Sequence, residues 1–426
     1  MSSSAGYVPR KASVLVSEAL SDTRIVVVNG ARQVGKSTLA REVSRSAPQV
    51  VERSLDRPAQ REAATSDPEG FLEHDGLMVI DEVQRVPDLW LAMKAAVDED
   101  PRPGRFLLTG SARLLALSSL PDALPGRTET IELWPLSQGE IDGLPDGFVD
   151  AAFSRGAELI HDPDAPETPR IDRAEYFERA VRGGYPDVVQ RSLPRRRGRL
   201  LAGYLSDMVS RDVHQVAQIQ RSEGMQRLLQ LLAGQVAGIL NVSRLSNDLS
   251  LDAATVRSYL SILETIFVIK RVPAYAPSPL TRATAAPKIT FVDSGLAAHL
   301  AGGLTRGSTA GNLLENFVLG ELGRQITWCE SVVQLFHYRD RDQREVDAVL
   351  EDLAGRVVGI EVKAAMSVRS DDFRGLRVLR DKLGDRFHAG FVLYCGHERL
   401  SFGGGLGCLP ISALWRTAPS GNRPIR

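Results

Sequence analysis

The amino-acid sequence predicts an α/β protein whose first part is a parallel sheet and whose last part is a second α/β domain. The first part contains short β-branched runs separated by helical segments, which favours parallel strands joined by right-handed crossovers. The middle is predominantly helical, and the alternation of strands and helices resumes after residue 312. A chain of 426 residues is long enough for two or three domains, each with its own core.

Four strands are expected in the first part, at residues 24–29 (RIVVVN), 77–82 (LMVIDE), 105–111 (RFLLTGS) and 130–136 (TIELWPL). The first three are nearly continuous apolar runs, which are typical of parallel strands buried on both faces. The fourth run is less apolar. Residues 141–170 are rich in Gly, Pro, Asp and Ala, and this composition indicates the edge of a domain.

The middle of the chain reads as helices followed by a winged helix-turn-helix. Helical segments are expected at 175–214, with a break at GGYP (183–186), and at 228–240. Residues 242–272 then combine a short helix, a turn, a second helix and an extended segment, the order found in winged helices. The second helix is nearly neutral and lacks base-reading Asn or Gln in its middle. DNA binding and domain packing therefore remain equally open for this module.

The remainder of the chain is predicted to begin with a Pro-rich linker and to continue as alternating helices and strands. The linker or loop covers residues 273–287, and a helix is expected at 312–325. Further strands are expected near 332–338, 346–350, 357–362 and 390–394, with a helix at 373–383.

A phosphate-binding loop follows the first predicted strand. The segment GARQVGKS, residues 30–37, matches the pattern G-x-x-x-x-G-K-[ST] at every fixed position and opens a helix. Its glycines allow backbone N–H groups to wrap a phosphate, Lys36 reaches the β- and γ-phosphate oxygens, and the Ser37 hydroxyl is a ligand for Mg²⁺. The sequence therefore predicts binding of ATP and Mg²⁺ by Gly30, Ala31, Arg32, Gln33, Val34, Gly35, Lys36, Ser37 and Thr38.

The ends of the later strands supply candidate catalytic groups. Asp81 is expected to hold Mg²⁺, and Glu82 to act as general base on the attacking water. A polar residue in Thr109–Ser111, with Ser111 as the candidate, could contact the γ-phosphate or simply cap a helix. Arg113 and Arg127 are candidates for a transition-state arginine, acting within or between subunits.

The sequence also resembles a widespread prokaryotic family of AAA-type ATPases with a C-terminal domain of unknown function. The resemblance rests on GARQVGKST, VIDEVQRVPD, LLTGSARLL and PGRTETIELWPLSQGEI in the first part, and continues through GGYPDVV, YLSDMVSRDV, FVDSGLAAHL and GNLLENFV. It implies an AAA-type ATPase core, a small winged-helix module and a nuclease-like C-terminal domain. The corresponding boundaries are 1–145 for the ATPase domain, 146–220 for a helical linker or lid, 221–285 for the winged-helix-like module and 286–426 for the last domain.

A second acidic constellation lies in the C-terminal part. Asp347 and the pair Glu361 and Lys363 occupy two strands that a turn could join, and Glu315 lies on the preceding helix. This D…E-x-K arrangement resembles the PD-(D/E)xK nucleases. In that chemistry Glu315, Asp347 and Glu361 would hold Mg²⁺, and Lys363 would act with Glu361 on the attacking water. The alternative is a solvated strand edge that carries acidic and basic side chains.

Composition limits the cellular setting and the partners. The net charge of −1 gives no overall attraction to nucleic acid, so DNA would have to bind a local patch of the winged-helix or C-terminal domain. Three cysteines without CxxC spacing fit a reducing compartment, and no segment approaches the ~18 apolar residues of a membrane span. We therefore expect a cytoplasmic protein without membrane contact, and a homo-oligomer is one option for its assembly.

Two functions follow from these features. The leading hypothesis is an ATPase that couples Mg²⁺-ATP hydrolysis to a nucleic-acid-directed, nuclease-like C-terminal domain. The second is a nucleotide-switched binding or regulatory protein whose C-terminal domain contacts a partner without cleavage. A small-molecule kinase is disfavoured, because the long second half of the chain does not read as an acceptor-binding lid.

Overall fold

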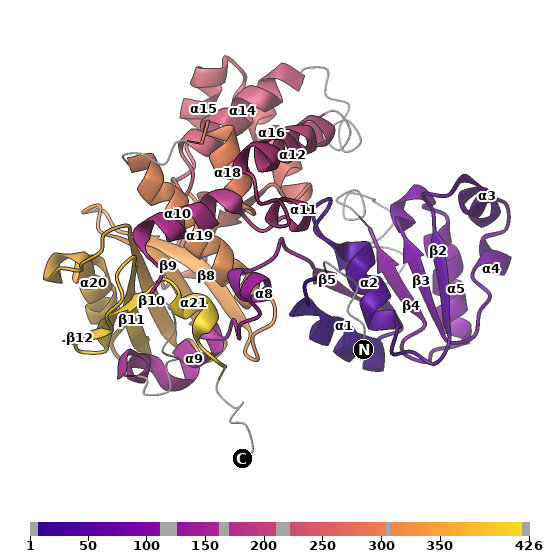
Figure 1. Ribbon diagram of the computed structural model, residues 1–426, viewed down its shortest axis with the longest axis horizontal. Coiled ribbons are helices and arrows are strands. Elements are labelled where there is room, and N and C mark those ends of the chain that lie inside the picture. The colour runs from indigo at the N-terminus through magenta and orange to yellow at the C-terminus, as the bar shows by residue number, and fades with distance from the viewer. Residues whose placement is uncertain (1–6, 111–125, 162–169, 210–221, 304–307, 420–426) are drawn as a thin grey trace.

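The computed structural model describes residues 7–110, 126–161, 170–209, 222–303 and 308–419. In Figure 1 the N-terminal sheet domain stands to one side of the molecule, and the middle helices lie above the C-terminal sheet. None of the helices within the described ranges is long and apolar enough to cross a membrane.

The N-terminal domain contains a parallel sheet, as the sequence predicts, but the sheet has five strands where four were expected. Its strands are β1 (Ile25–Asn29), β2 (Val50–Ser54), β3 (Leu77–Asp81), β4 (Phe106–Thr109) and β5 (Thr128–Glu132), and their order across the sheet is β2-β3-β4-β1-β5. Each pair of neighbours is parallel. Strand β2 was not predicted, because its sequence VVERS is mostly half-buried and polar at this edge of the sheet.

Helices cover both faces of this sheet. They are α1 (Ala12–Asp22), α2 (Lys36–Ser44), α3 (Pro58–Ser66), α4 (Pro68–Phe71) and α5 (Leu89–Glu99), with a 3₁₀ turn at Val83–Arg85. Alternate residues of β1 point to opposite cores: Val26 and Val28 pack in one, and Ile25 and Val27 in the other. This burial on both faces explains why the strand reads as an uninterrupted apolar run.

The middle of the chain is helical and ends in a small antiparallel pair of strands. Its first helices are α8 (Gln138–Asp142), α9 (Phe148–Arg155), α10 (Arg173–Arg182), α11 (Pro186–Val189) and α12 (Pro194–Asp207), with a 3₁₀ segment at Gly156–His161. Then follow α14 (Ser222–Gly234), α15 (Val242–Leu249), α16 (Ala253–Thr265), β6 (Ile269–Val272), α17 (Pro279–Thr284), β7 (Lys288–Phe291) and α18 (Ser294–Leu300). Helices α14 to α16 and the β6–β7 pair follow the order of elements in the winged-helix prediction, which stays a prediction. Because β7 pairs with β6, we count residues 288–291 with this winged-helix-like module, although the sequence-based boundary lies at residue 285.

The segment between β6 and β7 differs from the expected linker, because it is fastened to the C-terminal domain. The Tyr275 N–H donates to the carbonyl of His337, and the His337 N–H donates to that of Pro273. The guanidinium of Arg282 binds both carboxylate oxygens of Glu351, at 2.6 and 3.0 Å. In a winged helix this segment would be the wing, and here it packs against the C-terminal domain.

The C-terminal domain contains a six-stranded mixed sheet in the order β12-β13-β11-β10-β9-β8. Its strands are β8 (Val333–Arg339), β9 (Glu345–Asp352), β10 (Val357–Lys363), β11 (Phe387–Tyr394), β12 (Leu400–Gly403) and β13 (Leu406–Pro410). Helices α19 (Ser308–Gln325), α20 (Arg374–Leu383) and α21 (Ala413–Arg416) accompany it, and α19 and α20 both contact β10.

Residues 148–161, which were expected to belong to a linker or lid, pack against this C-terminal sheet. Phe148 of α9 meets Phe391 of β11 edge to face, with ring centroids 5.8 Å apart. The 3₁₀ segment after α9 contacts β11, β12 and β13. The C-terminal domain is therefore completed by residues that precede the winged-helix-like module in the sequence.

Candidate functional site

The phosphate loop connects the carboxyl end of β1 to the first turn of α2. Gly30 has φ 150° and Gly35 has φ 96°, both conformations that favour glycine. A side chain at Gly30 would also overlap the carbonyl oxygen of Leu133. The two fixed glycines of the motif thus occupy the backbone positions that require them, and the loop presents the amino end of α2, where an anion is favoured.

The Lys36 ammonium group lies within the loop that precedes it. Lys36 is buried, and its Nζ donates to the carbonyl oxygens of Gly30 at 3.0 Å and Ala31 at 2.7 Å. A cation held in this position lies at the concave side of the loop, where phosphate oxygens would be stronger partners than neutral carbonyl groups.

Ser37, Asp81 and Thr109 are brought together beside the loop by three different elements. The Ser37 hydroxyl at the start of α2 donates to Asp81 Oδ1 at 2.7 Å. The Thr109 hydroxyl at the end of β4 donates to the same carboxylate oxygen. Hydroxyl and carboxylate oxygens are the ligands that Mg²⁺ prefers, so this group fits the metal that the phosphate loop implies.

Glu82 follows Asp81 in a strained backbone conformation. Its φ is 59°, which is uncommon for a residue other than glycine. Its carboxylate accepts a hydrogen bond of 2.5 Å from Nε2 of the buried Gln84. The 3₁₀ turn that begins at Val83 thus fixes the glutamate directly beyond the strand that carries Asp81.

Two pockets flank the phosphate loop. One, of about 330 Å³, is lined by Ser37, Ala40, Arg41, Glu52, Arg53, Ser54, Arg57, Gln60, Val79, Asp81 and Thr109. The other, of about 370 Å³, is lined by Tyr7, Val8, Arg10, Gln33, Val34, Gly35, Thr38, Leu136, Pro186, Asp187 and Gln190. Arg53 and Arg57 were missed in the sequence because they belong to β2 and the turn after it, and β2 itself was not predicted.

Arg127 lies next to the amino end of β1, whereas the phosphate loop lies at the carboxyl end of that strand. The Arg127 carbonyl accepts from the N–H of Ile25, the first residue of β1, whereas the phosphate loop follows Asn29, the last residue of that strand. The guanidinium binds Asp98 at 2.6 and 3.0 Å. This position does not favour an action of Arg127 on the nucleotide of its own chain, and an action between subunits stays a prediction. Ser111 and Arg113 lie outside the described residues.

The predicted C-terminal carboxylates gather around a lysine that the sequence analysis did not consider. The side chain of Lys288, at the start of β7, is 3% exposed and forms ion pairs with Glu315 of α19 and with Asp347 of β9, the latter at 3.3 Å. Lys363 Nζ donates to Glu361 Oε1 at 2.8 Å. A sequence signal was available, because Lys288 opens the apolar strand KITF, where a charged residue needs a partner.

Burial and like charge set the ionisation of this cluster. Burial, followed by the charge of Asp347, raises the pKa of Glu315 and of Glu361 to about 8. Burial by itself would lower the pKa of Lys288, but the charges of Glu315 and Asp347 outweigh burial and raise it. The lysine therefore remains a cation, and it is the group that permits the carboxylates to lie close together.

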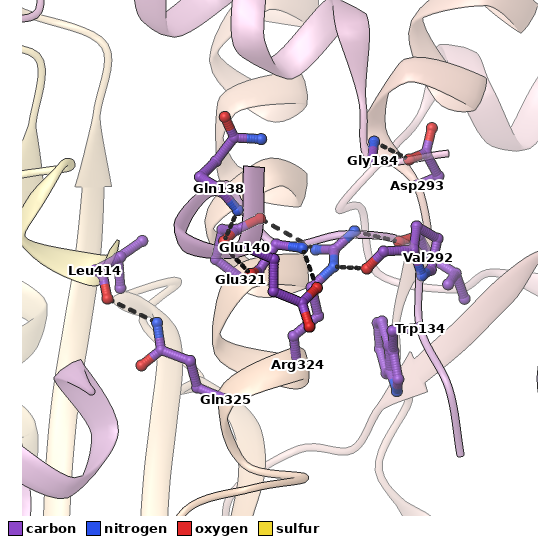
Figure 2. A network of polar contacts seen from close by, with 12 residues as sticks. Trp134, Gln138, Glu140, Gly184, Val292, Asp293, Glu321, Arg324, Gln325 and Leu414 are labelled. Atoms are coloured by element: carbon purple, nitrogen blue, oxygen red, sulfur yellow. Dashed lines mark hydrogen bonds and ion pairs between the residues drawn. The ribbon is translucent and has the colours of Figure 1, made fainter. Parts of the chain in front are cut away.

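A polar junction joins the phosphate-loop domain to the rest of the chain. Arg10 donates to the Val34 carbonyl in the phosphate loop at 2.8 Å, to the Trp134 carbonyl at 2.6 Å and to Glu140 of α8 at 3.1 Å. Figure 2 shows the continuation: the N–H of Gln138 donates to Glu321 of α19 at 3.0 Å.

Arg324 extends this junction from α19 to two further segments. It donates to the carbonyls of Pro135 at 2.9 Å and of Val292 at 3.1 Å (Figure 2). Next to Val292, Asp293 accepts from the N–H of Gly184, two residues before α11, at 2.7 Å. Helix α19 thus contacts the segment after β5 directly, and it is linked to the segment that leads to α11 through Val292 and Asp293.

Comparison with protein families assigns the first domain and leaves the others without a described activity. Residues 22–142 match the model of the AAA domain. The N-terminal domain is similar to this AAA domain and is called the AAA domain below. Residues 173–306 and 310–414 match two models that are each described as a domain of unknown function, DUF8612 and DUF4143. These matches support an ATP-binding ATPase and give no support to the nuclease resemblance.

Relatives with similar sequences extend over most of the chain. Uncharacterized proteins of Mycobacterium bovis and Mycobacterium tuberculosis are each 27% identical over 361 residues, which is 83% of this chain and 73% of theirs. An uncharacterized protein of Haemophilus influenzae is 26% identical over 256 residues, 58% of this chain and 57% of that protein.

Among solved structures, a Walker-type ATPase of Pyrococcus abyssi has a TM-score of 0.41 at 14% identity and covers 69% of this chain and 96% of its own. The RuvB Holliday junction branch migration motor of Thermotoga maritima has a TM-score of 0.28 at 19% identity, with 62% and 88% covered. At these scores the AAA assignment rests on the family model and on the sheet itself.

Proposed function

We propose that this protein binds ATP with Mg²⁺ at the phosphate loop and hydrolyses it. The observation that carries the proposal is the contact of 2.7 Å between the Ser37 hydroxyl and Asp81 Oδ1, beside a loop whose glycines and lysine match the phosphate-binding motif. When bound there, Mg²⁺ neutralises charge on the β- and γ-phosphates. Ser37 would be a ligand, and Asp81 would bind the metal directly or through water.

The two pockets suggest how the nucleotide lies across the loop. The pocket with Ser37 and Asp81 would receive the γ-phosphate, and its Arg53 and Arg57 would add positive charge. The pocket on the other side of the loop would receive the base. Tyr7 there offers an aromatic face, and Asp187 and Gln190 carry polar groups able to hydrogen-bond to a base edge.

Hydrolysis is assigned to the groups at the ends of β3 and β4. Glu82 would take the proton from the attacking water, with Gln84 holding its carboxylate in place. Thr109 touches the Asp81 carboxylate and would report on the γ-phosphate, the role that the sequence analysis gave to Ser111. A catalytic Arg127 would have to act on the nucleotide of a neighbouring subunit.

For the C-terminal domain we favour a regulatory or partner-binding role over cleavage of nucleic acid. Two observations support this choice: Lys288 lies among the carboxylates that were predicted to hold a metal, and the wing-like segment 273–287 is bound to the C-terminal sheet. DNA is a weaker candidate partner for the same reason, since a docked wing cannot also lie along a duplex.

Nucleotide binding and phosphate release by three variants test the ATPase proposal. Lys36→Ala should lose most ATP binding, because the phosphates lose their main cationic partner. Glu82→Gln should keep ATP binding and lose hydrolysis. Lys382→Ala, which removes an exposed lysine of α20, serves as the matched control and should behave as the parent. Parental ATP binding by Lys36→Ala would refute the site, and parental turnover by Glu82→Gln would refute the general base.

A further inference from the structure

We propose that the ammonium group of Lys288 is the resident cation of the C-terminal acidic cluster, and that this cluster takes no divalent metal in the folded chain. Lys288 comes from the winged-helix-like module, while Glu315 and Asp347 come from α19 and β9 of the C-terminal domain. The cluster is therefore a closed ion-pair contact between two modules, where the nuclease resemblance implies an open metal site.

The backbone around Lys288 holds its side chain in the cluster. Lys288 pairs with Val272 in the β6–β7 ladder and forms a bridge with Ile239 on its other side. Three residues on, the N–H and carbonyl of Phe291 are bound by the side chain of Asn316, on the helix that also carries Glu315. The ammonium group cannot leave without moving the strand or straining a buried side chain.

The carboxylate oxygens are largely committed to partners within the protein. Asp347 Oδ1 faces Lys288 at 3.3 Å, and its Oδ2 accepts from the N–H of Val362 at 2.9 Å. Glu361 Oε1 accepts from Lys363, and Glu361 Oε2 is buried without a hydrogen-bond partner in the described structure. Glu315 Oε1 also accepts from Lys288. A metal ion bound by two or more of these carboxylates would therefore compete with the partners that Glu315, Asp347 and Glu361 already have.

Electrostatics favours the lysine over a metal ion. Mg²⁺ demands near-ideal octahedral geometry and gives up its waters reluctantly. A Mg²⁺ ion between Glu315 and Asp347 would have to displace the ammonium group of Lys288. That group would then lie buried beside the metal ion or without a carboxylate partner, and both arrangements are costly. The residues predicted as metal ligands, Glu315, Asp347 and Glu361, therefore do not fit the metal. This corrects the sequence-based expectation of a Mg²⁺ site there.

Removal of the Lys288 ammonium group should allow a divalent metal ion to bind in the acidic cluster. Without the ammonium group, three carboxylates would share a buried site, and a cation would relieve their mutual repulsion. A folded chain with a neutral residue at this position should therefore acquire the divalent site that the native sequence excludes.

Mn²⁺ binding measured by electron paramagnetic resonance on nucleotide-free protein tests the proposal. All chains carry Asp81→Asn, so that the nucleotide site contributes little. Adding Asp347→Asn should leave Mn²⁺ binding unchanged, whereas adding Lys288→Ala should create one bound Mn²⁺ per chain, which Glu361→Gln then removes. Circular dichroism checks folding, and Glu361→Gln replaces Asp347→Asn in the first comparison if the latter does not fold.

Two outcomes would overturn the proposal. The first is Mn²⁺ binding in the Asp81→Asn chain that either carboxylate substitution abolishes, because a metal would then displace the lysine. The second is a folded Lys288→Ala chain that gains no Mn²⁺, because the ammonium group would then not be what excludes the metal. Lys288→Met, which keeps the length of the side chain without its charge, provides the same test if Lys288→Ala is unstable.

Discussion

At the scale of single residues, the choice of residues in the phosphate loop is constrained by the space around the backbone as much as by charge. Gly30 has a φ of 150° and lies against the carbonyl of Leu133, in the segment that follows β5. Arg10 also contacts this region, through the carbonyls of Val34 and Trp134. The loop is thus packed against the segment that leads to the rest of the chain.

We predict that Gly30→Ala lowers both the free energy of unfolding and the affinity for ATP. The added methyl group must push away the Leu133 carbonyl, and strained backbone of this kind costs about 1–3 kcal/mol. Urea unfolding and binding of a fluorescent ATP analogue measure the two effects. Gly203→Ala, in helix α12 with open space around it, is the matched control and should be neutral or slightly stabilising. Equal stability of the two variants would contradict the steric argument.

At the scale of secondary-structure elements, the turn after α8 is held by a buried carboxyl group. Asp146 Oδ2 accepts from the Ser137 hydroxyl, and Oδ1 accepts from the N–H of Gly139 at 3.2 Å. The Asp146 N–H also donates to the carbonyl of Trp415, in α21. Burial, followed by the charge of Glu321, raises the pKa of Asp146 to about 8.

This raised pKa predicts that Asp146 makes stability fall as the pH rises. The folded chain binds the proton more tightly than the unfolded chain, so the contribution is fully present below the unfolded pKa of about 4 and is lost as the pH rises to about 8. Asp146→Asn, which keeps an acceptor oxygen, should remove this part of the slope. Urea unfolding at pH 5 and pH 8 gives the comparison, and an unchanged slope in the variant would show that Asp146 is ionised in the folded chain.

At the scale of the whole molecule, helix α19 connects the two halves of the chain. Glu315 of this helix forms an ion pair with Lys288, and Glu321 and Arg324 in its last turns contact the junction with the AAA domain. The Arg324 side chain is 5% exposed. A nucleotide-dependent shift of the segment after β5 would therefore reach α19 through buried hydrogen bonds.

We predict that Arg324→Met uncouples the AAA domain from the remainder of the protein. The parent should unfold in one calorimetric transition, whose temperature rises with Mg²⁺ and a non-hydrolysable ATP analogue. The variant should show two transitions, of which the nucleotide shifts only that of the AAA domain. Arg374→Met removes an exposed arginine of α20 and should leave the single transition intact. A nucleotide shift of the whole Arg324→Met chain would exclude this junction as the coupling path.

Sequence alone predicted those features that contiguous residues encode. The parallel sheet follows from apolar runs buried on both faces, and the phosphate loop from a motif whose glycine positions the backbone requires. Strand β2 escaped prediction because an edge strand with half-buried residues lacks the apolar run, and Arg53 and Arg57 were missed with it. In the C-terminal part the acidic residues could be identified from their residue types, but the sequence does not show that Lys288 is their partner.

Tertiary structure alone decided what the carboxylates of the C-terminal domain face. Lys288 and Asp347 are 59 positions apart and belong to different modules. Their contact depends on how β7, α19 and β9 pack, because pairing of distant elements is set by the whole core. For the same reason the sequence did not show that segment 273–287 packs against the C-terminal sheet, or that α9 belongs to the C-terminal domain. Local backbone conformation depends on residues that are neighbours in the sequence, whereas the neutralisation of a buried charge depends on residues that only the folded chain brings within a few ångströms.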